Sequence, residues 1–173
     1  MAFRPTPITQ TSTYRMGALA LFLSAGVILA ALGFEHVGGY LPCPLCSMQR
    51  YAYYAAMPLL FLALVLIATE RPGLASLIFL VVGLGYLANA GLGIYHAGAE
   101  WKFWPGPSSC AAVSGDLATS AGSLLKDLER VQVIRCDEAT WRFAGLSFAG
   151  WNVLISPLLC AVSLRAAVTA RRT

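Results

Sequence analysis

The sequence predicts an all-α membrane protein, a bundle of four transmembrane helices with two loops on one side of the membrane. Its 173 residues are 58% hydrophobic and 12% charged, with a mean hydropathy of +0.68, which is typical of a membrane protein. Four runs without Asp, Glu, Lys or Arg are long enough to cross roughly 30 Å of hydrocarbon: Met16–Phe34, Tyr51–Thr69, Leu74–Tyr95 and Phe143–Leu164. We expect one membrane domain covering residues 1–173.

The basic residues are unevenly distributed between these runs. The two tails and the turn at 70–73 together hold six basic residues and one acidic residue. The loops at 35–50 and 96–142 together hold six basic residues and seven acidic residues. Because Lys and Arg resist translocation, we expect both termini in the cytoplasm and both loops outside. The net charge of +4 then reflects membrane topology and not nucleic-acid binding.

The loop at 96–142 is the only large segment outside the predicted membrane spans. It opens with Trp101 and Trp104, which are typical of the belt at a membrane surface. Apolar residues recur at helical spacing from Val113 to Val131 and predict a short amphipathic helix. Such a helix lies flat on the lipid or packs on the rest of the loop, and the pattern favours neither.

Cysteines mark the two outside loops. Four of the five lie there, and the fifth, Cys160, lies in the last apolar run; the four are Cys43, Cys46, Cys110 and Cys136. An oxidising outside compartment favours two disulfides.

Cys43-Pro44-Leu45-Cys46 is a C-x-x-C motif, in which two sulfurs can cycle between dithiol and disulfide. Haem attachment would need a histidine after Cys46, where Ser47 stands. Zinc is disfavoured because Cys110 and Cys136 form no second C-x-x-C. The sequence therefore predicts a redox pair without haem or metal.

The position of the C-x-x-C favours electron transfer. At the mouth of a helix it meets both the aqueous phase, where protein thiols are, and the bilayer, where quinones are. Cys110 and Cys136 enclose a long outside loop that a soluble protein can attack, so electrons can pass by thiol–disulfide exchange. The alternative is a non-catalytic scaffold whose disulfides staple the loops.

Arg50 and His96 are further candidates. Arg50 follows Cys46 by one turn, where a guanidinium favours a thiolate or the negative charge developing on a quinone oxygen; it is equally suited to anchoring the helix at the interface. His96, at the outer end of the third run, either passes a proton to a quinone or caps the helix.

The chain resembles the disulfide bond formation protein B (DsbB) family over nearly its whole length. The matching residues are, in chain order, Phe34-Glu35-His36-Val37, Pro42-Cys43-Pro44-Leu45-Cys46, Gln49-Arg50, Tyr95-His96, Cys110, Cys136, Trp141, Gly145-Leu146-Ser147 and Trp151. A vitamin K epoxide reductase-like protein is another quinone–thiol enzyme, but that family keeps its C-x-x-C later in the bundle. The contexts Gln49-Arg50 and Tyr95-His96 also argue against it.

The resemblance implies a bacterial inner-membrane enzyme that reoxidises a periplasmic DsbA-like protein and passes the electrons to ubiquinone or menaquinone. It makes Cys43 and Cys46 the quinone-coupled pair, with Cys46 nearest the ring and Arg50 beside it. It makes Cys110 the residue that forms a mixed disulfide with DsbA, and Cys136 the residue that exchanges with Cys43 and frees Cys46 as a thiolate. Cys160 has no counterpart and is expected to be a small apolar side chain.

Overall fold

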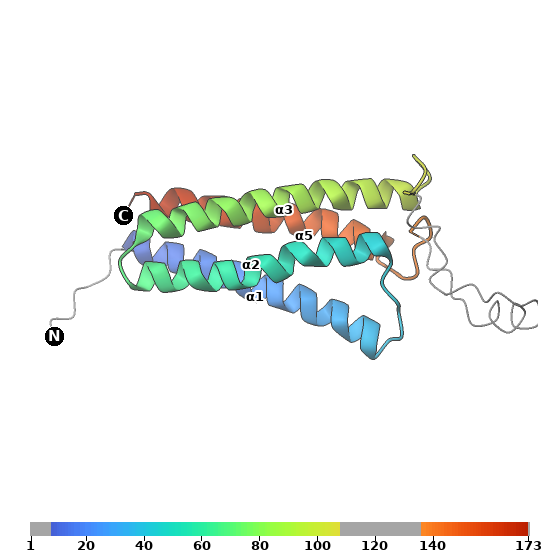
Figure 1. Cartoon of the computed structure of the whole chain (residues 1–173), viewed down its shortest axis with the longest axis horizontal. Coiled ribbons are helices and arrows are strands. Elements are labelled where there is room, and N and C mark those ends of the chain that lie inside the picture. Colours follow the sequence, from blue (N-terminus) through green and yellow to red (C-terminus); the bar gives the residue numbers. More distant parts are fainter. Residues whose placement is uncertain (1–7, 108–135, 173) are drawn as a thin grey trace, which may run out of the picture.

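Four long helices make up most of the described chain. The computed structural model describes residues 8–107 and 136–172. Within them the helices α1 (Ile8–His36), α2 (Pro44–Ala68), α3 (Pro72–Glu100) and α5 (Phe148–Ala170) run side by side (Figure 1). Each is long and apolar enough to span a membrane. The predicted four-helix membrane fold is therefore confirmed.

The two ends of the bundle differ. The start of α1, the end of α5 and the turn between α2 and α3 lie at one end, which we call the termini end (Figure 1). The opposite end carries the α1–α2 connection, the start of α2 at Pro44 and the end of α3 at Glu100. Because Cys43 directly precedes α2, we call this the thiol end.

The helices extend beyond the apolar runs that predicted them. At the thiol end α2 begins at Pro44 instead of Tyr51, and α3 continues to Glu100 instead of ending at Tyr95. Pro44 occupies the first helical position, where its fixed φ suits a helix and its missing N–H costs nothing. Polar side chains such as Arg50 end an apolar run without ending a helix, so Cys46, Arg50 and His96 are helical residues and not loop residues.

The last helix begins at Phe148 and not at Phe143. Strands β1 (Arg142–Phe143) and β2 (Leu146–Ser147) form a small antiparallel hairpin just before it. The turn places Gly145 at φ +82°, a conformation that glycine adopts without strain. Ser147 then caps α5, because its side chain accepts a hydrogen bond from the Gly150 amide.

Small residues hold the termini end together. Gly83 faces Leu164 so closely that an added Cβ would lie 2.9 Å from its Cδ2, and Ala75 and Ala166 are fully buried. Ser76 donates a hydrogen bond to the Ala167 carbonyl oxygen across 2.8 Å. Close approach through small residues is the usual packing mode of membrane helices, and it leaves little room for a ligand at this end.

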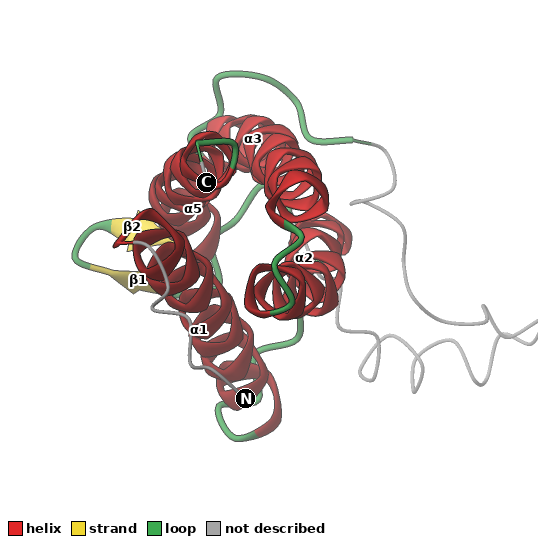
Figure 2. Cartoon of the chain, turned by 90° about the vertical axis from the view of Figure 1, so that its left-hand side faces the viewer, coloured by secondary structure: helices red, strands yellow, loops and turns green. Residues whose placement is uncertain are grey.

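The first helix separates from the others toward the thiol end. Figure 1 shows the C-terminal part of α1 leaving the remaining helices, and Figure 2 shows its tilt across them. The space between α1, α2 and α5 is where the cavity described below opens. The predicted amphipathic helix at Val113–Val131 lies outside the described residues, as does Cys110.

Candidate functional site

The C-x-x-C forms the first turn of α2. Cys43 is the N-cap residue, and its sulfur accepts a hydrogen bond from the Cys46 backbone N–H across 3.1 Å. The two sulfur atoms are 2.7 Å apart and are free thiols. Cys43 is buried and Cys46 is partly buried. A small movement is therefore enough to join the two sulfurs in a disulfide, whose bond length is about 2.05 Å.

The thiol of Cys43 is unusually acidic. The pKa of its thiol is lowered from 9.0 to about 5, chiefly by the hydrogen bond with the Cys46 side chain. His96 and the Cys46 backbone amide lower this pKa further, whereas burial opposes them. Helix N-termini and C-x-x-C motifs commonly stabilise a thiolate in this way. In the dithiol state Cys43 is thus the thiolate at neutral pH.

His96 lies beside that thiolate. Its ring is 1% exposed, with Nε2 3.6 Å from the Cys43 sulfur. Gln49 Nε2 donates to His96 Nδ1 across 2.8 Å, so Nδ1 carries a lone pair and the ring proton sits on Nε2. The C-cap of α3 is Trp101, bonded through its backbone. The helix-capping interpretation of His96 is therefore wrong.

Two further carboxylates face this region. Glu100 is 9% exposed, accepts a hydrogen bond from the Ser147 hydroxyl, and has Oε1 3.7 Å from His96 Nε2. Glu35, near the end of α1, forms an ion pair with Arg50. The contacts of Glu100 with Ser147 and of Glu35 with Arg50 each join two different helices or their caps, so these polar side chains also tie the thiol end together.

Arg50 is held and not free in solvent. Besides Glu35, its Nη2 lies 3.5 Å from the Ala31 carbonyl oxygen of α1, and the side chain is 18% exposed. It also lines the cavity that Cys46 lines. An interfacial anchor would project into water or headgroups, whereas this guanidinium is fixed at a cavity wall.

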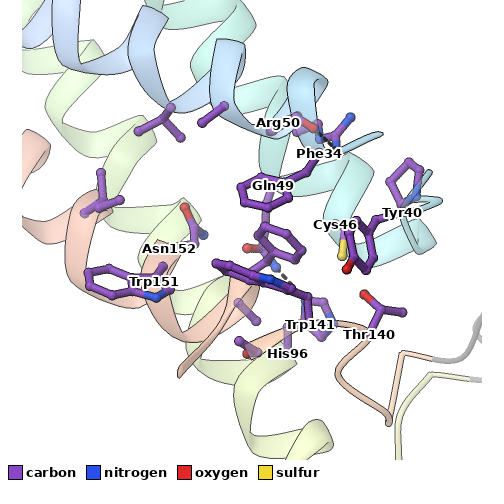
Figure 3. A pocket seen from close by; sticks show the side chains of 18 of the residues that line it. Phe34, Tyr40, Cys46, Gln49, Arg50, His96, Thr140, Trp141, Trp151 and Asn152 are labelled. Atoms are coloured by element: carbon purple, nitrogen blue, oxygen red, sulfur yellow. Dashed lines mark hydrogen bonds between the residues drawn. The ribbon is translucent and has the colours of Figure 1, made fainter. Parts of the chain in front are cut away.

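A cavity of about 560 Å³ opens at this site, within the range typical of small-molecule pockets. One part is polar and is lined by Cys43, Cys46, Gln49, Arg50, His96 and Glu100. Another follows α1 and is apolar, lined by Phe22, Leu23, Gly26, Val27, Ala30 and Ala31. In Figure 3 Cys46, Gln49 and Arg50 extend from α2, with Phe34 and Trp141 beside the same space.

Aromatic rings form one wall of the cavity. Trp141 stacks on Phe148 with centroids 4.8 Å apart, and Phe34 lies 4.7 Å from Trp141. All three line the cavity. Flat apolar rings of this kind suit a flat ligand ring.

Cys136 lies near the first cysteine pair. It is 1% exposed, is disulfide-bonded, and packs in one cluster with Cys43 and Leu45. The other half of its disulfide falls outside the described residues. The structure therefore brings together Cys43, Cys46, Cys136, Arg50 and His96, while Cys110 lies outside the described residues.

The thiol geometry favours disulfide chemistry over a metal. The Cys43 and Cys46 sulfurs and His96 Nε2 lie within 4.8 Å of one another, and these are atom types that zinc accepts. Tetrahedral zinc with Zn–S bonds of about 2.3 Å would hold two sulfurs roughly 3.8 Å apart. The observed 2.7 Å is too short for both sulfurs to ligate one zinc ion.

Comparison with known proteins identifies the family. The family model described as Disulfide bond formation protein DsbB matches residues 14–166. The chain belongs to the DsbB family. Relatives named Disulfide bond formation protein B include one from Marinobacter nauticus, 30% identical over 89% of this chain and 90% of the relative. Another, from Xanthomonas oryzae pv. oryzae, is 29% identical over 93% and 94%.

DsbB membership supports a multi-pass inner-membrane protein and a disulfide-forming oxidoreductase. The predicted resemblance is thereby confirmed, and the vitamin K epoxide reductase-like alternative is set aside.

Three residues at the site have contacts that the sequence did not predict: Glu100, Ser147 and Gln49. Gln49 and Ser147 do belong to the motifs that match the DsbB family. One signal was present for Glu100: it is one of only eight acidic residues, and it follows His96 by four positions, which is one helical turn.

Proposed function

We propose that this protein reoxidises a DsbA-like periplasmic thiol oxidase and passes the electrons to membrane quinone, sustaining disulfide formation in exported proteins. The observation that carries the proposal is the C-x-x-C dithiol at the wall of a cavity that continues as an apolar groove along α1. A quinone combines a polar ring with a long apolar tail, and both parts of the cavity match it. When bound, the quinone supplies an acceptor for two electrons and two protons.

The chain's own side chains have distinct tasks in this proposal. Cys46 lines the cavity and donates toward the ring. Cys43 is the thiolate that closes the disulfide onto Cys46. Arg50 stabilises negative charge that develops at the cavity wall, because a guanidinium offers a planar fork of donors.

Cys136 provides the route from the protein partner. Its packing against Cys43 supports exchange between the two cysteine pairs. Free thiols at Cys43 and Cys46 together with a disulfide at Cys136 correspond to the stage at which the first pair holds the electrons. By family resemblance, Cys110 is the residue that takes electrons from DsbA.

Energetics explain the need for a quinone. DsbA is itself a strong oxidant, at about −120 mV. Only a stronger oxidant can take electrons from its dithiol, and ubiquinone or menaquinone is the candidate in the bilayer. The cysteine loops then face the periplasm and both termini the cytoplasm, as the distribution of basic residues predicts.

Anaerobic mixing tests the proposal. Purified full-length protein is mixed with reduced DsbA and either ubiquinone or menaquinone, and both redox changes are followed together. We expect one quinone reduced for each DsbA disulfide formed. Cys110→Ser should leave the first pair able to reduce quinone yet block DsbA oxidation, because the two steps use different pairs.

The alternative function, a scaffold stapled by disulfides, predicts a different result in cells. A staple stays oxidised whether or not quinone is present. The proposed oxidase accumulates reduced Cys43 and Cys46 when quinone is depleted, which thiol trapping detects. Unchanged trapping in quinone-depleted cells would contradict the proposal.

A further inference from the structure

Glu100 is a carboxyl at the wall of the cavity that the thiol relay leaves without a task. It ends α3, is 9% exposed, and lines the same cavity as Cys46 and Arg50. Its neighbours are the Ser147 hydroxyl, which donates to it, and His96 Nε2 at 3.7 Å. A carboxyl buried at the end of a membrane helix is costly and commonly marks a proton or ion route.

The charges around Glu100 come from two other elements besides its own. On α3 it faces His96, and from α2 and its N-cap it faces Cys46 and Cys43. From β1, Arg142 also acts on it. Two carboxyl side chains line the cavity, Glu100 and Glu138, and of these only Glu100 is buried. Glu35 does not line the cavity and is ion-paired with Arg50.

His96 is a hydrogen-bonding residue at the cavity with partners on both ring nitrogens. Gln49 donates to Nδ1, so the ring N–H on Nε2 lies between Cys43 and Glu100. This N–H donates toward the Cys43 thiolate and the Glu100 carboxyl, and we therefore assign His96 to positioning Glu100.

Proton counting then requires another donor. With Cys43 as a thiolate, oxidation of the pair forms one S–S bond, breaks the Cys46 S–H bond, and releases two electrons and one proton. Quinone takes up two electrons and two protons. A second proton is therefore needed from another source, and a carboxyl at the cavity wall is placed to supply it.

We propose that Glu100 is the proton carrier of this site, an inference that rests on the proposed function. Its O–H bond breaks to supply the second proton, and the carboxylate left behind takes a proton back from the outer aqueous phase. Ser147 and His96 hold the carboxyl in place from two sides.

Single-turnover reduction of quinone by the pre-reduced full-length protein tests this proposal. Glu100→Gln keeps the size of the side chain and an oxygen for the Ser147 hydroxyl but has no proton to give. We expect quinone reduction to slow about a hundredfold, the lower range for loss of a general acid. Alkylation of Cys43 at pH 7 should be unchanged, because thiolate formation does not need Glu100.

The pH profile separates proton transfer from a structural role. The wild-type rate should fall as pH rises and Glu100 ionises, whereas Glu100→Gln should be slow and insensitive over the same range. Glu100→Asp should retain the pH dependence. In Glu100→Ala, added acetic acid should restore part of the rate, which a lost structural contact would not allow.

Two controls make the result decisive. Glu70→Gln makes the same change in the turn at the termini end and should keep the wild-type rate. Ser147→Ala removes the contact that holds Glu100 but leaves its carboxyl, and should keep the pH dependence. A wild-type rate of quinone reduction in Glu100→Gln would overturn this inference. So would a Ser147→Ala variant that loses as much rate as Glu100→Gln and no longer depends on pH. Either result would leave the proposed function standing. Failure of the wild type to reduce any quinone would overturn the proposed function as well.

Discussion

The termini end and the thiol end of this bundle are built from equally long apolar helices, yet they are held together differently. At the termini end, small residues such as Gly83 and Ala166 let helices approach closely. At the thiol end, α1 separates from the other helices (Figure 1) and polar pairs connect the elements: Glu35 with Arg50, Gln49 with His96, Ser147 with Glu100. One end is specialised for packing and the other for chemistry.

The comparison shows how a membrane protein makes room for a reaction. Polar groups buried in a bilayer need partners, so residues that serve the chemistry also bridge helices. A mutation at the thiol end is therefore expected to change rate and helix association together, and matched variants are needed to separate the two. A mutation at the termini end should change only stability.

The largest expected effect is that of Cys46→Ser at the thiol end. Quinone reduction should be lost completely, because the thiol that donates toward the ring is gone and no disulfide can form with Cys43. Quinone absorbance during turnover measures this. Cys160→Ala, which changes a buried thiol in α5, is the matched control and should turn over normally. Normal turnover by Cys46→Ser would refute the assigned role of the pair.

Arg50→Lys should produce the next largest effect. Charge is kept but the planar donor fork is lost. Loss of one charge-assisted hydrogen bond costs about 1.5–3 kcal/mol, or roughly ten- to hundredfold in quinone-dependent rate or apparent affinity. Steady-state oxidation of DsbA against quinone concentration measures it, with yield after membrane insertion as the folding control.

Glu35→Gln sharpens the test of Arg50. It removes the ion-pair partner on α1 and leaves the guanidinium in place, so it reports how much of the Arg50 effect is helix bridging. If Arg50→Lys matches the wild type at every quinone concentration, Arg50 is an anchor and its catalytic role is wrong.

How far the sequence could predict this structure also differs between the two ends. Four apolar runs were enough for the helices, because hydrocarbon thickness fixes their minimum length. The first residues of α2 and α5, Pro44 and Phe148, could not be found from the apolar runs. They are set by local signals, a proline at the first helical position of α2 and the Ser147 cap of α5, and these add little hydrophobicity.

The closeness of Cys43 and Cys46 was predictable because the C-x-x-C spacing is recognisable in the sequence. The partnership of Glu100 with Ser147 was not, since it joins residues 47 positions apart in the chain. Its formation depends on how α3 packs against α5. For the same reason, the contact between Gln49 and His96 and the acidic Cys43 thiol could not be predicted, because both depend on three-dimensional contacts.

A smaller effect is expected at the boundary between the two regions. Tyr53 donates to Asn152 Oδ1 across 2.7 Å, and Asn89 donates to the same oxygen across 3.1 Å, so three helices meet there. Tyr53→Phe should lower thermal stability by about 0.6 kcal/mol, and by no more than about 1.7 kcal/mol, the range for hydrogen bonds between membrane helices.

Melting of the detergent-solubilised protein measures that change, with the apparent quinone affinity determined in parallel. Tyr53 and Asn152 also line the cavity. The two measurements together therefore show whether these residues contact the quinone or only hold the helices together. Lower stability with unchanged quinone affinity assigns the cluster to packing. An unchanged melting temperature with an altered apparent quinone affinity would instead make Tyr53 part of the quinone site.

The smallest expected effect is the pH dependence of the Cys43 thiol. Its pKa is lowered to about 5, so it is a thiolate above pH 5 and loses that charge as pH falls through 5. In the fully reduced protein, alkylation of Cys43 should be constant from pH 6.5 to 7.5 and about half as fast at pH 5, by the fraction ionised. Peptide mapping by mass spectrometry distinguishes Cys43 from Cys160, which is buried in α5 and should react slowly throughout. A midpoint near the ordinary thiol value of 9.0 would mean that the Cys46 side chain, His96 and the N-cap amide do not stabilise the thiolate. The thiol end would then lack the feature that most distinguishes its sulfur from that of Cys160.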